Sequence, residues 1–490
     1  MTFASLEFLV FLPIVLLLYR IFPSKLRWFV LLVGSYVFCG LYDVAVLIAI
    51  VSVTLISYIC ARKIESAIET VVKKVYLGIS VVASVAILFV YKYFGFFAEG
   101  FNGLTAAIGL GIPDLELDLI VPIGISFFTL RTIAYTVDVF RKRQLPEKHI
   151  GYYALYVSFF PTLLAGPIEE PSGLIEQLKA KKPFAGYDAA YGFKMLAVGF
   201  FKLVVASRLV SGYADTVFAN TNTIDFNLMN GFTVLFGAIM FAVQIYCDFS
   251  GMCDIGTGCA ALMGIKLSES YHAPYLANGV TDLHHRWNIS VTNWFERYVY
   301  EPMGGKSSSG VKRFLKLGLV YLLAGLWYGS GVTFILFGLM HLVLRIIEEI
   351  IEKPNKEKKP EFINKKLYKF FKRIVLAVAV IVSLILLRSD DLKSFGILVT
   401  TLFTGWGGID FIGSMNAIGV SVISLVTVIA AIYTVITLDR QITLKRNELR
   451  YDEALRPERA HAYIVLCWAV AIAWLILLTA GAGGYEYFKF

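Results

Sequence analysis

One histidine lies in the middle of an apolar run, His341 in FILFGLMHLVL (334–344). If this run is a membrane helix rising about 1.5 Å per residue, the imidazole lies near the middle of the bilayer. Ionisable groups at that depth are costly, so they usually mark a functional site. Imidazole ionises near neutral pH and suits a general base that deprotonates an alcohol or assists a thiol leaving group. The alternative is a neutral imidazole that is hydrogen-bonded to a neighbouring helix.

A second candidate, Asn288, lies in HHRWNISVTNWF (284–295), where aromatic and basic residues are interleaved. An amide both donates and accepts hydrogen bonds. It could therefore hold a thioester carbonyl, or orient an acceptor, while negative charge develops on oxygen. Aromatic residues mixed with basic ones are also typical of membrane interfaces, so the alternative is an amphipathic anchor helix.

Other polar residues lie inside apolar runs. Gln244, Asp248 and Asp254 are expected to form a buried network that braces the helices, with a direct role for Asp248 less favoured. Arg131 and Asp138 are expected to pair with each other within Leu119–Phe140. Tyr328, in the turn GLWYGS between two apolar runs, could line a cavity.

The composition indicates what positions these residues. The chain has 490 residues, of which 58% are hydrophobic and 17% charged, and its mean hydropathy is +0.70. A soluble protein carries about 25% charged residues, whereas apolar runs of about 20 residues are long enough to span a bilayer. We therefore predict an all-α polytopic membrane protein, one domain over 1–490. About 11–12 membrane helices, with re-entrant or interfacial helices, would surround a central tunnel.

The net charge of +9 does not indicate nucleic-acid binding. The basic residues lie in short connectors between apolar runs, where they are typical of cytoplasmic loops. The six cysteines form no C-x-x-C pair or Cys/His cluster, so no metal site is predicted.

Several segments should depart from simple spanning helices. Gly151–Ala165 is too short to cross and should be re-entrant or interfacial. Gly231–Gly264 should be tilted, broken or extended beyond the membrane. Gly100–Asp118 and Ser211–Asn230 are expected to be outside loops, and Ala462–Leu478 the last helix.

Together these motifs resemble the membrane-bound O-acyltransferase (MBOAT) family, especially its bacterial branch typified by the alginate O-acetylation membrane protein. The resemblance covers most of the chain. It rests on blocks that occur in the family's order: VPIGISFFTLRTIAYTVDVFR (121–141), YVSFFPTLLAGPIEEP (156–171), QIYCDFSGMCDIGTG (244–258), PYLANGVTDLHHRWNISVTNWFERYVYEPMGG (274–305), AGLWYGSGVTFILFGLMHL (324–342) and the ending GYEYFKF.

The resemblance implies acyl transfer from a thioester, usually a coenzyme A thioester reached from the cytoplasm. The family's signature histidine falls on His341. Its second signature position, histidine in much of the bacterial branch, falls on Asn288. The branch also usually has histidine where this chain has Tyr328. These departures concern the subgroup, donor or acceptor more than the reaction class.

The leading hypothesis is therefore a multi-pass O-acyltransferase of the bacterial inner or plasma membrane. It would use acetyl-CoA as a substrate, with no permanently bound cofactor. His341 would be the general base and Asn288 would position the reactants. Residues assigned to the substrate site are Arg286, Trp287, Trp294, Tyr328 and Asp248.

The expected partners are the lipid bilayer and a separate extracytoplasmic polysaccharide O-acetyltransferase protein that modifies a polysaccharide or peptidoglycan. Three alternatives stay open. The first is transfer of D-alanine from a phosphopantetheine carrier protein to teichoic acid. The second is a transporter or flippase, which also needs a polar intramembrane pathway. The third is an inactive scaffold that recruits other enzymes.

Overall fold

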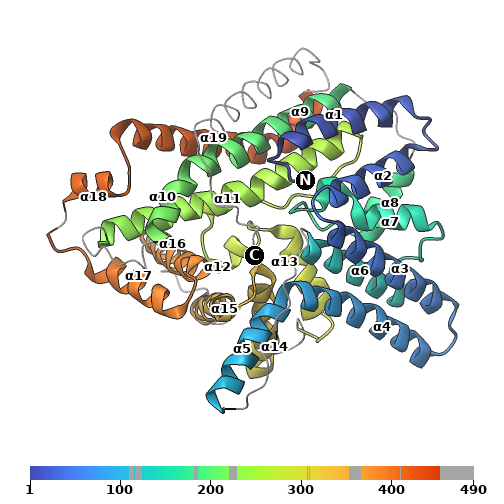
Figure 1. Ribbon diagram of the computed structural model, residues 1–490, viewed down its shortest axis with the longest axis horizontal. Helices are drawn as coiled ribbons and strands as arrows, with labels where there is room; N and C mark the ends of the chain where they lie inside the picture. The colour runs from blue at the N-terminus through green and yellow to red at the C-terminus, as the bar shows by residue number, and fades with distance from the viewer. Residues whose placement is uncertain are drawn as a thin grey trace.

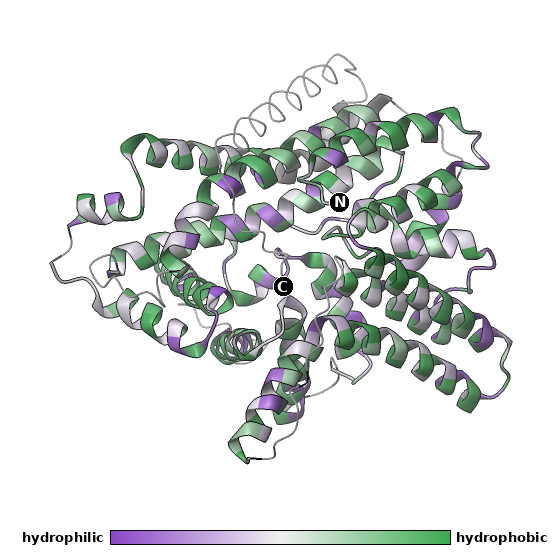
Figure 2. Ribbon diagram, in the orientation of Figure 1, coloured by the Kyte–Doolittle hydropathy of each residue, from purple (hydrophilic) through white to green (hydrophobic). Residues whose placement is uncertain are grey.

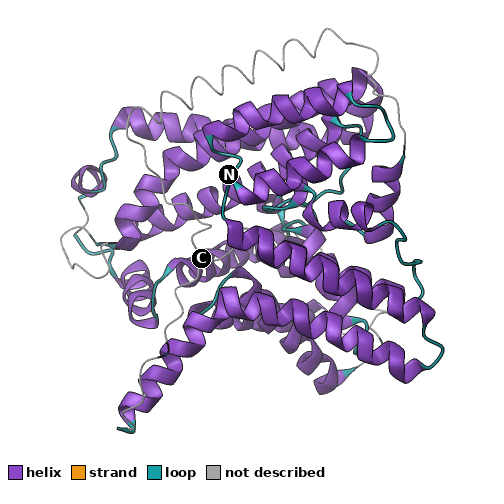
Figure 3. Ribbon diagram, turned by 45° about the vertical axis from the view of Figure 1, so that its right-hand side comes forward, coloured by secondary structure: helices purple, strands orange, loops and turns teal. Residues whose placement is uncertain are grey.

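The fold is helical throughout the part of the chain that the structure describes. No strand occurs there, which confirms the predicted all-α class (Figure 3). The computed structural model describes residues 1–109, 115, 124–180, 186–219, 229–305, 307, 309–352, 366–408 and 410–452.

The N-terminal helices follow the apolar runs closely. They are α1 (Leu6–Ile21), α2 (Arg27–Gly40), α3 (Val44–Ser66), α4 (Thr70–Leu88) and α5 (Phe94–Ala107). A π-helical turn, Phe89–Tyr93, joins α4 and α5 into one continuous helix. The outside loop predicted from Gly100 was wrong as far as Ala107, because Gly100 and Gly103 are accommodated inside α5. A helical glycine costs only about 1 kcal/mol relative to alanine, which tertiary context can override.

The middle of the chain contains α6 (Ile125–Phe140), α7 (Ile150–Ser158), α8 (Pro171–Lys179), α9 (Gly186–Phe200), α10 (Ser207–Ala219) and α11 (Gly231–Leu262). A π-helical turn, Phe201–Ala206, joins α9 to α10. The outside loop predicted from Ser211 was therefore wrong as far as Ala219, where α10 ends.

The C-terminal part contains α12 (Val280–His284), α13 (Ile289–Phe295), α14 (Gly310–Tyr328), α15 (Val332–Glu352), α16 (Lys366–Arg388), α17 (Leu392–Thr404), α18 (Phe411–Ala417) and α19 (Val422–Asp452). Another π-helical turn, Glu296–Tyr300, follows α13. The predicted last helix, Ala462–Leu478, and the ending GYEYFKF lie outside the described residues.

The chain is a multi-pass membrane protein. Among the described residues, five helices are long and apolar enough to cross a bilayer: Val44–Ser66, Thr70–Ala107, Gly231–Leu262, Lys366–Arg388 and Val422–Arg440. Apolar residues cover the outer faces of these helices (Figure 2). The five are fewer than the crossings expected from sequence. Among the described residues, α2 is a shorter apolar helix, and α14 carries charges at Lys312, Arg313 and Lys316.

Helix α11 forms the centre of the fold (Figure 1). It is a single helix of 32 residues without a break, and 67% of its apolar stretch is buried. The Asn230 side chain caps its first turn by accepting a hydrogen bond from the Thr233 amide at 3.0 Å. Glycines permit close packing on α9, since a Cβ at Gly199 would lie only 2.7 Å from the Gly251 carbonyl oxygen.

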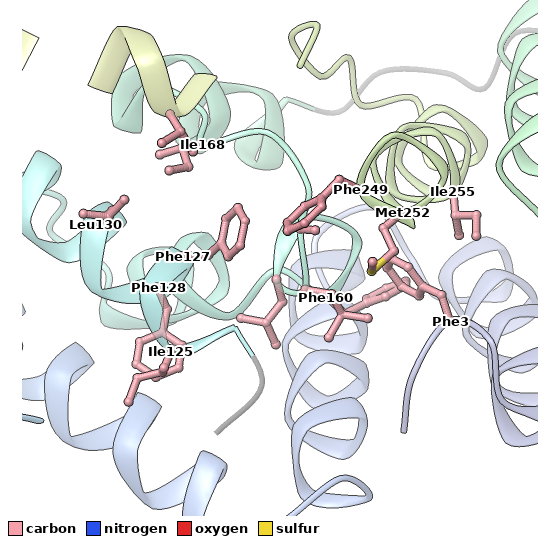
Figure 4. Packing of buried hydrophobic residues seen from close by; sticks show 14 of the residues in the cluster. Phe3, Ile125, Phe127, Phe128, Leu130, Phe160, Ile168, Phe249, Met252 and Ile255 are labelled. Carbon is pink, nitrogen blue, oxygen red and sulfur yellow. The ribbon is translucent and has the colours of Figure 1, made fainter. Parts of the chain in front are cut away.

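A broken segment, comprising α7 and the 3₁₀ turn Phe160–Thr162, packs beside α6 and α11 (Figure 4). Fully buried Arg131 of α6 donates hydrogen bonds to its carbonyl oxygens, those of Val157 (3.3 Å) and Thr162. These bonds satisfy irregular backbone that has no water available. The predicted pairing of Arg131 with Asp138 was wrong: Asp138 instead accepts from Tyr298 Oη at 2.7 Å and from Arg143.

Candidate active site

A cavity of about 870 Å³ opens between α11, α12, α13, α14, α15, α16 and α19. These elements surround the middle of the molecule in the view of Figure 1. The walls are largely aliphatic and aromatic, with a few polar groups, which is typical of a small-molecule site. Four of the predicted site residues line it: Trp287, Asn288, Tyr328 and His341.

His341 lies on α15 at the cavity wall and is only 7% exposed. Both of its ring nitrogens have partners. Nδ1 lies 3.1 Å from Nε2 of His284, and Nε2 lies 3.2 Å from Oγ of Ser383 on α16. The ring also packs against Phe337, with the ring centroids 4.6 Å apart. The imidazole is therefore held by polar contacts to two separate elements.

His284 ends the short helix α12 and connects His341 to α14. Its Nδ1 lies 3.0 Å from the hydroxyl of Tyr321, and its carbonyl oxygen accepts from Thr292 Oγ1 at 3.1 Å. Tyr321, His284, His341 and Ser383 thus form a continuous chain of hydrogen bonds across four elements. The chain borders the cavity along much of its length.

Hydrogen bonds to a paired carboxylate hold α12 against α15. The backbone and hydroxyl of Thr281 donate to Glu348 of α15 at 2.8 and 2.5 Å, and Lys372 of α16 pairs with the same carboxylate at 2.7 Å. On the outer side, burial opposes ionisation of Asp282. Hydrogen bonds from Asn278 and Arg286 outweigh that effect and lower the pKa of Asp282 below its usual value. Asp282 is therefore held as a carboxylate.

Asn288 begins α13 and is 6% exposed. Its backbone is left-handed, with φ +45° and ψ +55°. Asn, Asp and His enter this region more readily than other residues that carry a Cβ. The backbone carbonyl accepts from the amides of Val291 and Thr292, whereas its side-chain amide has no hydrogen bond among the described residues. The amide is thus available at the cavity wall.

Trp287 and Tyr328 form a second polar contact at the wall, with indole Nε1 donating to the Tyr328 hydroxyl at 2.9 Å. Tyr328 ends α14, whose last carbonyl oxygens are held by α4–α5. Lys92 Nζ donates to the carbonyl of Trp327 at 2.6 Å, and Tyr93 Oη to that of Leu326 at 2.7 Å. A cation near the C-terminus of a helix also interacts favourably with the helix dipole.

Comparison with known proteins agrees with this geometry. Residues 125–386 match the model of the membrane-bound O-acyltransferase family, MBOAT. That stretch includes every helix from α6 to α16, and so most of the cavity wall. The chain belongs to the MBOAT family.

Several curated MBOAT relatives are similar over long stretches. The chain is 30% identical to "Probable alginate O-acetylase AlgI" of Pseudomonas aeruginosa, covering 80% of this chain and 73% of that protein. It is 31% identical to "Peptidoglycan O-acetyltransferase" of Helicobacter pylori, over 66% and 63%. It is 30% identical to "Teichoic acid D-alanyltransferase" of Bacillus subtilis, over 49% and 62%. The protein is an acyltransferase, which disfavours the transporter and inactive-scaffold hypotheses.

Three other residues assigned to the substrate site are not on the wall of this MBOAT cavity. Arg286 pairs with Asp282 at 2.7 Å. Trp294 Nε1 donates to the Leu130 carbonyl at 2.9 Å and so anchors α13 on α6. Asp248 accepts from Ser207 at 2.5 Å. In this structure these side chains brace the elements around the site, and a substrate contact for them stays a prediction.

Gln244, Asp248 and Asp254 were expected to form a buried network that braces the helices. Asp254 pairs with Lys202 at 2.7 Å, and Asp248 accepts from Ser207. The amide of Gln244 is buried and makes no hydrogen bond with the described residues. The two acids therefore brace α11 against the preceding segment, Phe201–Ala219.

Sequence reasoning missed His284, Tyr321, Ser383 and Lys92. The available signal for His284 was the pair of adjacent histidines, but its neighbour His285 is exposed, and nothing local distinguishes the two. Lys92 was visible as a lone cation in an apolar run. Ser383 and Tyr321 are ordinary residues in apolar helices. Only the packing of α16 on α15 brings Ser383 to His341, and only the packing of α14 on α12 brings Tyr321 to His284.

Proposed function

We propose that this protein transfers an acetyl group from acetyl-CoA, bound from the cytoplasmic side, to a hydroxyl of an extracytoplasmic polysaccharide or cell-wall acceptor. The observation that carries the proposal is His341. In an MBOAT chain, this buried imidazole is held by two polar partners at the wall of a largely apolar cavity. Such a cavity suits the acyl end of a thioester, and the imidazole suits its transfer.

In the proposed reaction, His341 takes the proton of the acceptor hydroxyl. The hydroxyl oxygen of the acceptor then attacks the carbonyl carbon of the thioester. The carbon–sulfur bond breaks, and the departing thiolate takes up the proton. The amide of Asn288, which has no partner among the described residues, donates to the carbonyl oxygen as negative charge develops. Holding both substrates in one cavity supplies the proximity on which the step depends.

The charge of the cavity supports a donor that carries phosphate groups. Arg313, Arg345 and Arg373 line it. They lie near the start of α14, the end of α15 and the start of α16, so the antiparallel order of these helices places them at one end. Arg313 and Arg345 share Glu349, which leaves net positive charge there. Arginine recognises phosphate through its planar set of donors. The charged connector that follows α15 is expected to be cytoplasmic.

D-alanine transfer from a phosphopantetheine carrier is the second candidate, since that donor also carries a phosphate and a thioester. The likeness to the Bacillus subtilis D-alanyltransferase favours it, but over a smaller share of the chain than the likeness to the alginate relative. We therefore place acetyl transfer first. We further propose a bacterial cell-membrane location and a separate extracytoplasmic O-acetyltransferase as the partner that completes delivery to the polysaccharide.

The test is to incubate purified protein in lipid vesicles with radiolabelled acetyl-CoA and, separately, with a D-alanyl carrier protein. Wild type should release CoA and transfer label, and His341→Ala and Asn288→Ala should lose most of this activity. Label transfer that is unchanged in His341→Ala would contradict the catalytic assignment. Turnover of the carrier protein but not of acetyl-CoA would establish the second candidate.

A further inference from the structure

The contact between Ser383 and the Val380 carbonyl favours one direction for the chain of hydrogen bonds through His341. The Ser383 hydroxyl donates to the Val380 carbonyl at 2.8 Å, so its oxygen accepts from His341 Nε2–H. A neutral imidazole has one N–H and one lone pair. Nδ1 of His341 therefore carries the lone pair and accepts from His284 Nε2–H. Nδ1 of His284 then accepts from the Tyr321 hydroxyl.

In this orientation His341 has no unshared lone pair. The second lone pair of the two rings is then on Nδ1 of His284, where it accepts from the Tyr321 hydroxyl. If the orientation reverses, so that His341 Nδ1–H donates to His284, the lone pair appears on Nε2 of His341 instead. In both orientations one proton lies between the rings. The two imidazoles therefore accept a proton as one unit rather than as separate groups.

We propose that His284 is a second functional histidine of this site, a positioning residue that fixes the tautomer of His341 and shares the proton that His341 receives. The inference rests on the proposed function, because it concerns the proton of that transfer. His284 is suited to the role because α12 is itself held by Thr281 on Glu348 and by the Thr292 contact.

The proton balance of the step is complete. In the reversed orientation, the acceptor hydroxyl loses its proton to Nε2 of His341 as the hydroxyl oxygen bonds the acyl carbon, and the pair becomes a monocation. The carbon–sulfur bond breaks with its electron pair on sulfur, and the monocation returns one proton to that thiolate. Alcohol and thioester become ester and thiol, and the pair ends neutral. No oxidant, reductant or further reactant is needed.

The groups that face the pair set its basicity. On α14, Tyr321 donates to the lone pair and so favours the neutral form. On α15, Arg345 is one turn from His341, and its positive charge opposes protonation although Glu349 partly offsets it. Directly after α12, the exposed His285 adds a smaller effect of the same sign when it is charged. Ser383 of α16 carries no charge. Sharing a proton between two rings spreads charge in a site where these neighbours disfavour it.

Two variants separate proton sharing from support. His284→Gln places an amide where the ring nitrogen was; it can donate to His341 or accept from it, but cannot become a cation. His285→Gln makes the same replacement at the adjacent exposed position and is the matched control. Thermal unfolding and gel filtration in detergent establish that both variants are folded.

In acetyl-CoA turnover, we expect His284→Gln to lower kcat by at least about tenfold, while KM for the donor stays within about threefold. His285→Gln removes only a through-space charge, so kcat and KM should both stay within about twofold of wild type. The pH dependence of kcat should also change in His284→Gln, since a single imidazole then titrates. A folded His284→Gln enzyme with wild-type kcat and an unchanged pH profile would overturn the proposal.

A second measurement does not depend on turnover. Solid-state nitrogen NMR of protein labelled at histidine should show His341 with a lone pair on Nδ1 and a proton on Nε2. The His341 signals should move in His284→Gln and stay in place in His285→Gln. Signals of His341 that are the same in His284→Gln as in wild type would overturn the contact itself. Wild-type protein that turns over no acetyl-CoA would count against the proposed function alone, and the NMR result would still decide the pairing.

Discussion

Two buried ionisable side chains, Arg131 and His341, differ in the partners that they contact. Sequence singled out both, because each lies within an apolar run. Arg131 is directed at the carbonyl oxygens of Val157 and Thr162, and so supports the irregular backbone beside α6. The two ring nitrogens of His341 meet side chains of α12 and α16, and the ring borders the cavity. Burial within an apolar helix marks both residues, whereas their partners and access to the cavity distinguish a supporting residue from the proposed base.

The largest effect on activity is expected for His341→Ala. It should lower kcat of acetyl transfer by about 10²–10⁴, the range of general-base catalysis, while the unfolding temperature changes little. The rate is measured as CoA release in lipid vesicles, and the unfolding by differential scanning fluorimetry. A large fall in the unfolding temperature would instead place His341 with Arg131, as a residue that supports the fold.

Arg131→Met should do the reverse. Removing the guanidinium leaves two buried carbonyl oxygens unpaired, at a cost of about 1–3 kcal/mol each. We expect a lower unfolding temperature and a lower yield of folded protein, with kcat per folded molecule close to wild type. Arg131→Lys is the informative second variant. It restores one hydrogen-bond donor, so it should recover part of the stability that Arg131→Met loses. Full stability of Arg131→Met would contradict the role in supporting the broken segment.

Tyr321→Phe tests the direction of the hydrogen bond between Tyr321 and the histidine pair. The lost hydroxyl donates to the lone pair of the neutral pair, so its removal makes protonation easier and raises the pKa of the pair. The pair must be neutral to accept a proton. The acid limb of the kcat profile should therefore move to higher pH, by about 0.7 unit for a hydrogen bond of about 1 kcal/mol. A shift to lower pH would be inconsistent with the direction of the hydrogen bonds.

The smallest effect is expected for Tyr328→Phe. It removes the acceptor of the Trp287 indole but keeps the ring that packs against Phe337, with centroids 5.4 Å apart. We expect KM for the donor to rise by about two- to threefold with kcat preserved, because only a wall contact is lost. A loss of kcat equal to that of His341→Ala would place Tyr328 in the chemistry.

What the sequence could predict depended on whether a signal was local. The all-α class follows from runs of apolar residues and is confirmed. The depth of His341 in the membrane stays a prediction, as does the membrane-surface position of Asn288. The interleaved aromatic and basic residues alone did not distinguish Asn288 from an anchor residue, and only the family resemblance singled it out. The wrong loop boundaries at Gly100 and Ser211 came from composition, since polar or glycine-rich stretches can continue a helix that packing supports.

The remaining errors concern partners that are distant in sequence. Arg131 and Asp138 lie about two helical turns apart, which made a pair plausible. The carbonyl oxygens that Arg131 actually meets belong to a segment that no periodicity reveals. Likewise, His284 becomes distinct from His285 only when α12 is placed against α15. A histidine–histidine contact between residues so far apart in the chain requires the tertiary fold.

The left-handed backbone at Asn288 limits which amino acids selection can try there. A β-branched or bulky residue would have to distort the turn that starts α13, whatever chemistry it offered. Asparagine and histidine both enter this conformation readily, so the exchange between them leaves the loop intact. The conformation of the main chain thus limits position 288 to a few residue types. A lineage can therefore exchange asparagine and histidine at this position without first rebuilding the turn that starts α13.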